Sequence, residues 1–143
     1  AEIKLKKLRT NQDVKVNEAA NLLASLSYAN VRKMSMVPGI VAFLVAGIDD
    51  EGAHLYNIGV DGSITEETEY ATEGSGSVFA YGVFETMYKK DMSLEEAKKL
   101  VLKALNAAMQ RDSASGSGYD LLTITKDGVK IQPSQEVKAT INM

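Results

Sequence analysis

The chain has 143 residues, of which 45% are hydrophobic and 24% are charged, the composition of an ordinary folded domain rather than a disordered segment. Its formal net charge of −3 and its scattered lysines give no sign of a nucleic-acid-binding surface. It has no cysteine, which excludes disulfides, thiolate nucleophiles and thiolate zinc sites, and any imidazole chemistry would depend on the single histidine, His54.

The sequence also bears on membrane spans, metal sites and the cellular compartment of the protein. The longest apolar run, from Ile40 to Ala46, is strand-sized and shorter than the roughly 18–20 residues that cross a bilayer. The acidic residues show neither calcium-loop nor zinc-ligand spacing, so no metal is expected. The absence of cysteine fits a reducing compartment, and we expect a cytoplasmic protein without a membrane or nucleic-acid partner.

The first half of the chain predicts two helices followed by three strands. Apolar residues among lysines over 3–9 predict the end of an amphipathic helix, and because no capping residue precedes it, we expect its true start to be missing. A second helix is predicted over 16–28, and a connector follows over 30–38. Strands are predicted over 40–45, 53–58 and 63–71.

These three strands are expected to form an antiparallel meander. The run over 40–45 is continuously apolar, which is typical of a strand buried on both faces, and Leu55 and Ile58 of the next strand are expected to point inward. The turn sequences over 49–52 and 61–62 separate the strands.

The second half predicts two helices and a hairpin. A helix is predicted over 78–88, and Ser93 with Glu96 forms the capping box of the next one. The apolar face of that helix carries Ala97, Leu100, Val101, Ala104, Leu105 and Ala108. A loop over 113–118, a hairpin formed by 121–125 and 129–131, and a helical tail from Pro133 complete the prediction. Runs of helices beside runs of strands indicate an α+β fold, here as one domain over 1–143.

Three stretches carry a family resemblance. They are ATEGSGSVFAYGVFE over 71–85, KDMSLEEA over 90–97 and AAMQRDSASG over 107–116. In this order and spacing the chain resembles archaeal-type β subunits of the 20S proteasome, which are N-terminal-nucleophile (Ntn) hydrolases. The simpler bacterial two-ring relative matches these strings less well.

The resemblance implies a four-layer αββα sandwich whose early strands are absent from this chain. It implies a threonine-type endopeptidase that degrades unfolded polypeptides to peptides and works without a cofactor. Its partners would be other β subunits in a ring of seven, together with rings of α subunits. The nucleophilic threonine, a lysine and an early aspartate would precede Ala1, and Thr10 is not that nucleophile. We therefore expect the printed chain to be inactive alone.

The resemblance also assigns site residues. Asp112 and Ser115 would bind around the amine of the nucleophilic threonine, and Ser75 would lie beside them and help to position a proton or water. Asp49 and Asp50 would border the specificity pocket of the neighbouring subunit. A non-catalytic ring subunit or an assembly intermediate is the alternative function.

Without the resemblance, the same residues have simpler interpretations. Asp112 lies at the C-terminal end of a helix, where the helix dipole disfavours an anion, and it could be a solvated acid offset by Arg111. Ser75 could be an ordinary N-cap, or less plausibly part of a phosphate-binding loop, and Ser115 before a glycine could be a helix stop. His54, in a predicted strand, is more often a structural residue than a catalyst.

Overall fold

A computed structural model of the chain describes residues 2–33 and 39–136, and it divides into two compact units, Ala1–Ala71 and Thr72–Met143. Each unit combines helices with an antiparallel sheet, so the α+β prediction is confirmed. The single domain expected over 1–143 stays a prediction. In the described part of the chain, no helix has the length and apolar character that a membrane span requires.

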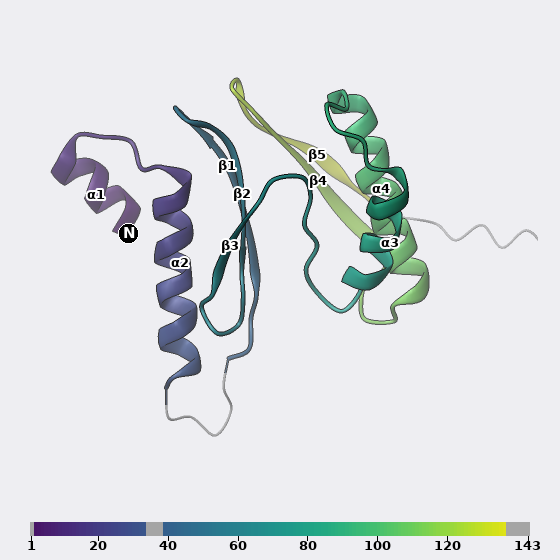
Figure 1. Cartoon of the computed structure of the whole chain (residues 1–143), viewed down its shortest axis with the longest axis horizontal. Coiled ribbons are helices and arrows are strands. Elements are labelled where there is room, and N and C mark those ends of the chain that lie inside the picture. The colour runs from purple at the N-terminus through teal and green to yellow at the C-terminus, as the bar shows by residue number, and fades with distance from the viewer. Residues whose placement is uncertain (1, 34–38, 137–143) are drawn as a thin grey trace, which may run out of the picture. The chain divides into compact units, whose positions relative to one another are not determined.

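The first unit contains two helices and a three-stranded sheet. Its elements are α1 (Glu2–Thr10), α2 (Val16–Val31), β1 (Phe43–Asp49), β2 (Gly52–Ile58) and β3 (Ile64–Glu67). The strands pair antiparallel in the order β1-β2-β3, which confirms the predicted meander. Helix α2 lies along one face of this sheet (Figure 1).

Small residues let α2 approach the sheet closely. Ala20 and Ala24 of α2 form a buried core with Tyr56 and Ile58 of β2. A Cβ atom added to Gly47 of β1 would lie only 2.7 Å from a methyl carbon of Val16. The helix therefore rests almost directly on the strand backbone, and burial of apolar area on this face holds the unit together.

Two of the strand predictions were wrong about burial. Strand β1 begins at Phe43 rather than Ile40, and Leu44 remains 40% exposed, because within this unit α2 covers only one face of the sheet. Leu55 is half-buried, not inside, because side chains alternate along a strand and those of Tyr56 and Ile58 occupy the covered face.

The ends of α2 and β3 also differ from the prediction. Helix α2 continues past residue 28 to Val31, and residues 34–38 of the predicted connector lie outside the described residues. Strand β3 stops at Glu67 instead of Ala71, because the chain bends at residues 68 and 69 and leaves the edge of the sheet.

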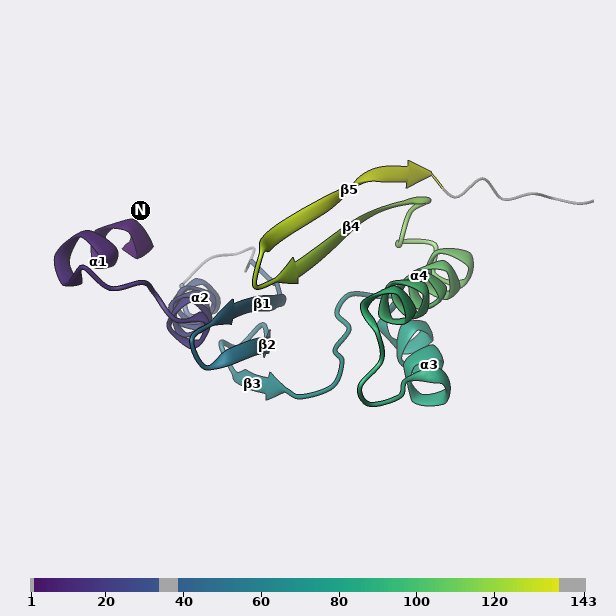
Figure 2. The same cartoon turned by 90° about the horizontal axis from the view of Figure 1, so that it is seen from above.

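The second unit pairs two packed helices with a hairpin. Its elements are α3 (Ser77–Met87), α4 (Leu94–Arg111), β4 (Gly118–Thr125) and β5 (Gly128–Glu136), seen from a second direction in Figure 2. The two helices contact each other, and the buried stripe of α4 consists of Leu100, Ala104 and Ala108, each four residues apart.

Local signals fixed the ends of these elements as predicted. The backbone N–H of Ser93 donates to Glu96 at 2.9 Å, and the N–H of Glu96 donates to the Ser93 hydroxyl at 3.3 Å, which confirms the capping box. In the predicted hairpin, Thr125 pairs with Gly128 across a two-residue turn.

The helical tail predicted from Pro133 was wrong. Strand β5 continues to Glu136, and its backbone pairs Gln135 with Tyr119. Between the pairs Leu121–Gln132 and Tyr119–Gln135, two residues of β5 oppose one residue of β4, which is a bulge. A proline fits at such a position because it has no N–H to donate to the ladder. Residues 137–143 lie outside the described part of the chain.

Replacing Ser27 with alanine should stabilise the protein. Ser27 in α2 is buried, and its hydroxyl has no hydrogen-bond partner among the described residues. A buried unpaired polar group costs about 1–3 kcal/mol, so we expect Ser27→Ala to raise the free energy of unfolding by about 1 kcal/mol in denaturant titrations.

The matched control is Ser25→Ala in the same helix. The Ser25 hydroxyl is exposed and donates to the Asn21 carbonyl at 2.9 Å, so both variants share the change in helix propensity and differ in burial. A Ser27→Ala protein no more stable than Ser25→Ala would contradict the burial argument.

Candidate functional site

The second unit brings Ser75, Asp112 and Ser115 together at the junction of two helices. Ser75 lies just before α3, Asp112 is the C-cap of α4, and Ser115 follows in the loop after α4. The hydroxyl of Ser75 donates to Oδ2 of Asp112 at 2.6 Å, and that of Ser115 donates to the same oxygen at 2.5 Å. These three residues are called the hydroxyl–carboxylate cluster below.

The loop after α4 forms around the same carboxylate. The backbone N–H of Ala114 donates to Oδ1 of Asp112 at 3.3 Å, and the N–H of Ser115 donates to the Asp112 carbonyl at 3.2 Å. Gly116 then takes a φ of 66°, in the left-handed region that glycine enters easily. Ser115 therefore belongs both to the helix stop and to the cluster.

Hydrogen bonding keeps Asp112 ionised despite its position. The Ser115 hydroxyl first, then the Ser75 hydroxyl and the Ala114 N–H, lower the pKa of the Asp112 carboxyl below its ordinary value, while partial burial opposes them. The interpretation in which Arg111 offsets a solvated carboxylate explains neither hydroxyl contact. The N-cap interpretation of Ser75 is wrong, because Gly76 occupies the N-cap position of α3.

The direction of these hydrogen bonds determines what the cluster can bind. An ionised carboxylate only accepts hydrogen bonds, so both serine hydroxyls must donate to it. Their remaining lone pairs can accept from a further donor, and Ser75 is exposed. The cluster therefore suits a group that donates N–H bonds, above all an amine or ammonium, which the nearby negative charge would also favour.

Asp49 serves a different purpose in the first unit. Its Oδ2 accepts the backbone N–H of Val16 at the start of α2, at 3.0 Å, and its Oδ1 accepts that of Glu51 at 2.9 Å. Chiefly because of the Val16 bond, the pKa of Asp49 is lowered. Its carboxylate thus ties the end of β1 to the start of α2.

His54 extends this tie across the sheet. Its Nε2 lies 3.2 Å from Oδ1 of Asp49, and its Nδ1 lies 2.8 Å from Oε1 of Glu66 on β3. The bond to Glu66 first, and then the Asp49 carboxylate, raise the pKa of His54, while burial opposes them. The side chain is only 17% exposed, in keeping with a structural role. Sequence patterns missed this contact, although Glu66 pairs with Tyr56, two residues from His54.

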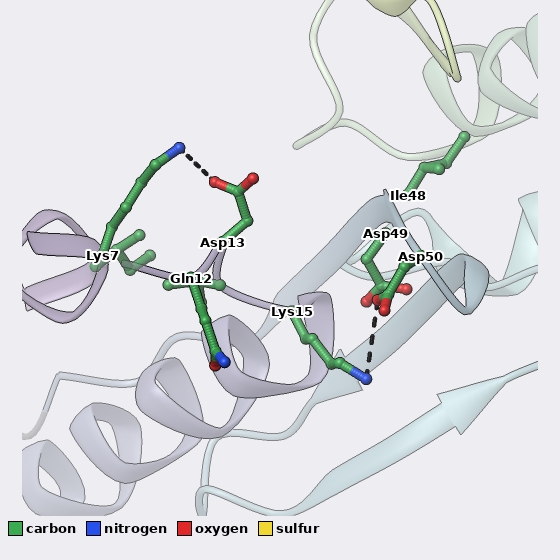
Figure 3. Close-up of a pocket in the computed structure, with 9 residues that line it drawn as sticks. Lys7, Gln12, Asp13, Lys15, Ile48, Asp49 and Asp50 are labelled. Carbon is green, nitrogen blue, oxygen red and sulfur yellow. Dashed lines mark hydrogen bonds and ion pairs between the residues drawn. The ribbon is translucent and has the colours of Figure 1, made fainter. Parts of the chain in front are cut away.

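Asp50 is the exposed member of the predicted pocket pair. Its side chain is 77% exposed, and its carboxylate lies 3.8 Å from Nζ of Lys15, which also pairs with Glu51. Both Asp49 and Asp50 line a pocket of about 880 Å³ in the first unit (Figure 3). Its other lining residues are Ile3, Lys7, Gln12, Asp13, Val14, Lys15 and Ile48.

Thr10 ends α1, and its hydroxyl donates to the Lys6 carbonyl at 3.0 Å. Over residues 2–33 and 39–136, no group of three or more histidine, aspartate or glutamate side chains is arranged to hold a metal ion.

The fold and the cluster define an α+β protein in which two serine hydroxyls and one carboxylate meet at a helix junction. A family model described as "Proteasome subunit" matches residues 1–124. The chain therefore belongs to the proteasome subunit family, and its mixed architecture agrees with the α+β fold of Ntn hydrolases.

Similar proteins carry consistent names. The "Proteasome subunit beta" proteins of Methanocaldococcus fervens and Methanocaldococcus jannaschii are each 41% identical over 143 residues, covering 99% of this chain and 62% of theirs. "Proteasome subunit beta 2" of Thermofilum pendens is 41% identical over 141 residues, covering 97% of this chain and 67% of that protein. The chain thus spans 62% of the length of the two Methanocaldococcus relatives.

The contribution of His54 to stability should depend on pH. Its pKa is raised on folding, so its ion pairs stabilise the protein fully below the ordinary histidine value of about 6.5, and this stabilisation is lost as the pH rises through the folded-state pKa. We expect His54→Gln to lower the free energy of unfolding more at about pH 5.5 than at about pH 9.

The control for this prediction removes a carboxylate instead of the imidazole. Glu66→Gln removes the carboxylate that contributes most to the raised pKa of His54, so it should reduce the same pH dependence. Urea titrations at both pH values measure the difference. An equal loss of stability at the two pH values for His54→Gln would contradict the charged contact.

Proposed function

We propose that the complete protein is a catalytic β subunit of a 20S proteasome core particle, a threonine-type endopeptidase that degrades unfolded polypeptides to peptides in the cytoplasm. Membership of the proteasome subunit family supports the assembly. The hydroxyl–carboxylate cluster carries the catalytic part of the proposal, because a purely structural subunit has no need for an exposed acceptor site at this junction.

In this proposal the cluster holds the α-amine of an N-terminal threonine. In the complete protein, this threonine would lie in the region that corresponds to the part of the relatives not covered by this chain. Its N–H groups would donate to the outward lone pairs of Ser75 and Ser115, while the charge of Asp112 would favour the ammonium form that arises during the reaction.

The reaction itself is acyl transfer followed by hydrolysis. The threonine hydroxyl attacks the peptide carbonyl and gives its proton to the α-amine, which then protonates the departing peptide amine. Water attacks the resulting ester, gives a proton back through the amine, and releases the second peptide and the free hydroxyl. Ser75, Asp112 and Ser115 fix and polarise the amine throughout but form no bond to the substrate.

Neighbouring subunits would complete the substrate site. We propose that the protein assembles with other β subunits in a ring of seven and with rings of α subunits. The exposed Asp50 would face the specificity pocket of the next subunit, where its carboxylate would favour basic peptide side chains. Asp49 would act on that pocket indirectly, because its two oxygens already hold Val16 and Glu51.

Changes in the cluster should lower turnover in the assembled particle. We expect Asp112→Asn to reduce kcat by about 10²-fold or more, because it removes the charge that favours the protonated amine. Ser75→Ala and Ser115→Ala should each cost about tenfold. Peptide hydrolysis by particles reconstituted from the complete gene product measures these effects, with assembly checked by size.

The control is Ser113→Ala, a serine exposed in the same loop as Ser115, and it should leave kcat unchanged. If the mature protein has no N-terminal threonine, or if the assembled wild-type particle cleaves no peptide, the catalytic proposal fails. The non-catalytic ring subunit would then be the better description.

A further inference from the structure

Gly76 lies where the first residues of α3 meet the last turn of α4, next to the cluster. It is buried, and its φ of −81° and ψ of 0° lie in a region that any residue adopts. Gly74, two residues earlier, has a φ of 98° and is required by the backbone conformation. The backbone gives no such reason for a glycine at position 76.

The reason is space. A Cβ atom on residue 76 would lie 2.6 Å from Oγ of Ser115, 2.9 Å from Cβ of Ala108 and 3.4 Å from Oδ2 of Asp112. The first two distances are shorter than the contacts that Cβ atoms make with other atoms in folded proteins, so some atom would have to move. Two of the three atoms belong to the hydroxyl–carboxylate cluster itself.

The conflicts with Ser115 and Ala108 would be relieved in different ways. The Ser115 hydroxyl can rotate away, but it then gives up its 2.5 Å hydrogen bond to Asp112. The Cβ of Ala108 is fixed to the backbone of α4 and cannot rotate, so residue 76 would have to withdraw from the helix. Ser75 precedes residue 76 directly, and its hydroxyl would be carried away from Asp112.

We propose that Gly76 is a positioning residue whose missing side chain allows Ser75 and Ser115 to converge on Asp112, with Ala108 as the matching small residue on α4. The inference about geometry stands on the contacts above, and its consequence for catalysis rests on the proposed function. Gly76 touches no substrate in this scheme and acts through the cluster.

The test compares Gly76→Ala with Gly82→Ala. Gly82 lies within α3, and a Cβ atom there would meet nothing within 4 Å, so this variant adds the same methyl group to the same helix without a conflict. In the full chain, the pKa of Asp112 is measured by carboxyl carbon NMR, with Asp112→Asn used to assign the signal. In reconstituted particles, kcat and KM are measured with a peptide substrate.

We expect Gly76→Ala to raise the pKa of Asp112 toward its ordinary value, because both hydroxyl donors are displaced. It should lower kcat by between about 10-fold and 10²-fold with little change in KM, and Gly82→Ala should change neither quantity. An unchanged Asp112 pKa in Gly76→Ala overturns the inference. If wild-type particles cleave no peptide, the proposed function fails, but the NMR measurement still decides whether Gly76 positions the cluster.

A double variant covers the case in which Gly76→Ala does not fold. Ser115→Ala removes the oxygen that the new Cβ would meet at 2.6 Å, so Gly76→Ala with Ser115→Ala keeps only the 2.9 Å conflict with Ala108 and should fold more readily than Gly76→Ala alone. Its Asp112 pKa should then exceed that of Ser115→Ala, because the conflict with Ala108 still moves Ser75 away from Asp112. An Asp112 pKa equal to that of Ser115→Ala would overturn the inference. A double variant that also fails to fold would assign Gly76 to helix packing alone and overturn the inference.

Discussion

A negative charge at the carboxyl end of a helix is the constraint on which the candidate site depends. Asp112 ends α4, where the helix dipole opposes an anion by about 0.3–1 kcal/mol. The charge is stabilised there by two hydroxyl donors and one backbone N–H. One of those hydroxyls belongs to Ser75, 37 residues earlier, so the contact between α3 and α4 is as much a part of the site as its polar atoms.

Asp49 shows the opposite arrangement. It lies at the start of α2, where the helix dipole favours an anion, and it accepts the N–H of Val16 there. Together with His54 and Glu66 it connects α2 to all three strands of its sheet. An acid in a favourable position that satisfies its neighbours needs no function beyond stability. An acid held in an unfavourable position by donors with free lone pairs is the better candidate for chemistry.

Both arrangements rely on small residues that bring main chains close together. Gly47 lets α2 rest on β1, and Gly76 lets the start of α3 meet the end of α4. Gly47 lies two residues before Asp49 in the sequence, and Gly76 lies next to the Asp112 carboxylate in space. Packing and electrostatics are therefore coupled in this chain, because the donors reach their acceptors only where the backbones approach this closely.

Features that depend on neighbours along the chain could be predicted from the residues alone. Three local features could be predicted in this way, because each depends on residues no more than four apart in the sequence. They are the capping box at Ser93, the buried stripe of α4 and the two-residue hairpin turn. The family resemblance could also be seen in the sequence, because the motifs around Ser75 and Asp112 are uninterrupted stretches of residues. The meeting of Ser75, Asp112 and Ser115 was expected from that resemblance and not from spacing.

Contacts between distant segments became known from the three-dimensional structure. It showed that Asp49 caps a helix 33 residues earlier, that one face of β1 stays open within its unit, and that the tail from Pro133 pairs as a strand. It also showed that a Cβ atom on residue 76 would conflict with Ser115 and Ala108, although φ at this position is negative. Burial, strand pairing and long-range hydrogen bonds depend on which surfaces meet, and a local pattern of residues does not specify its distant neighbour.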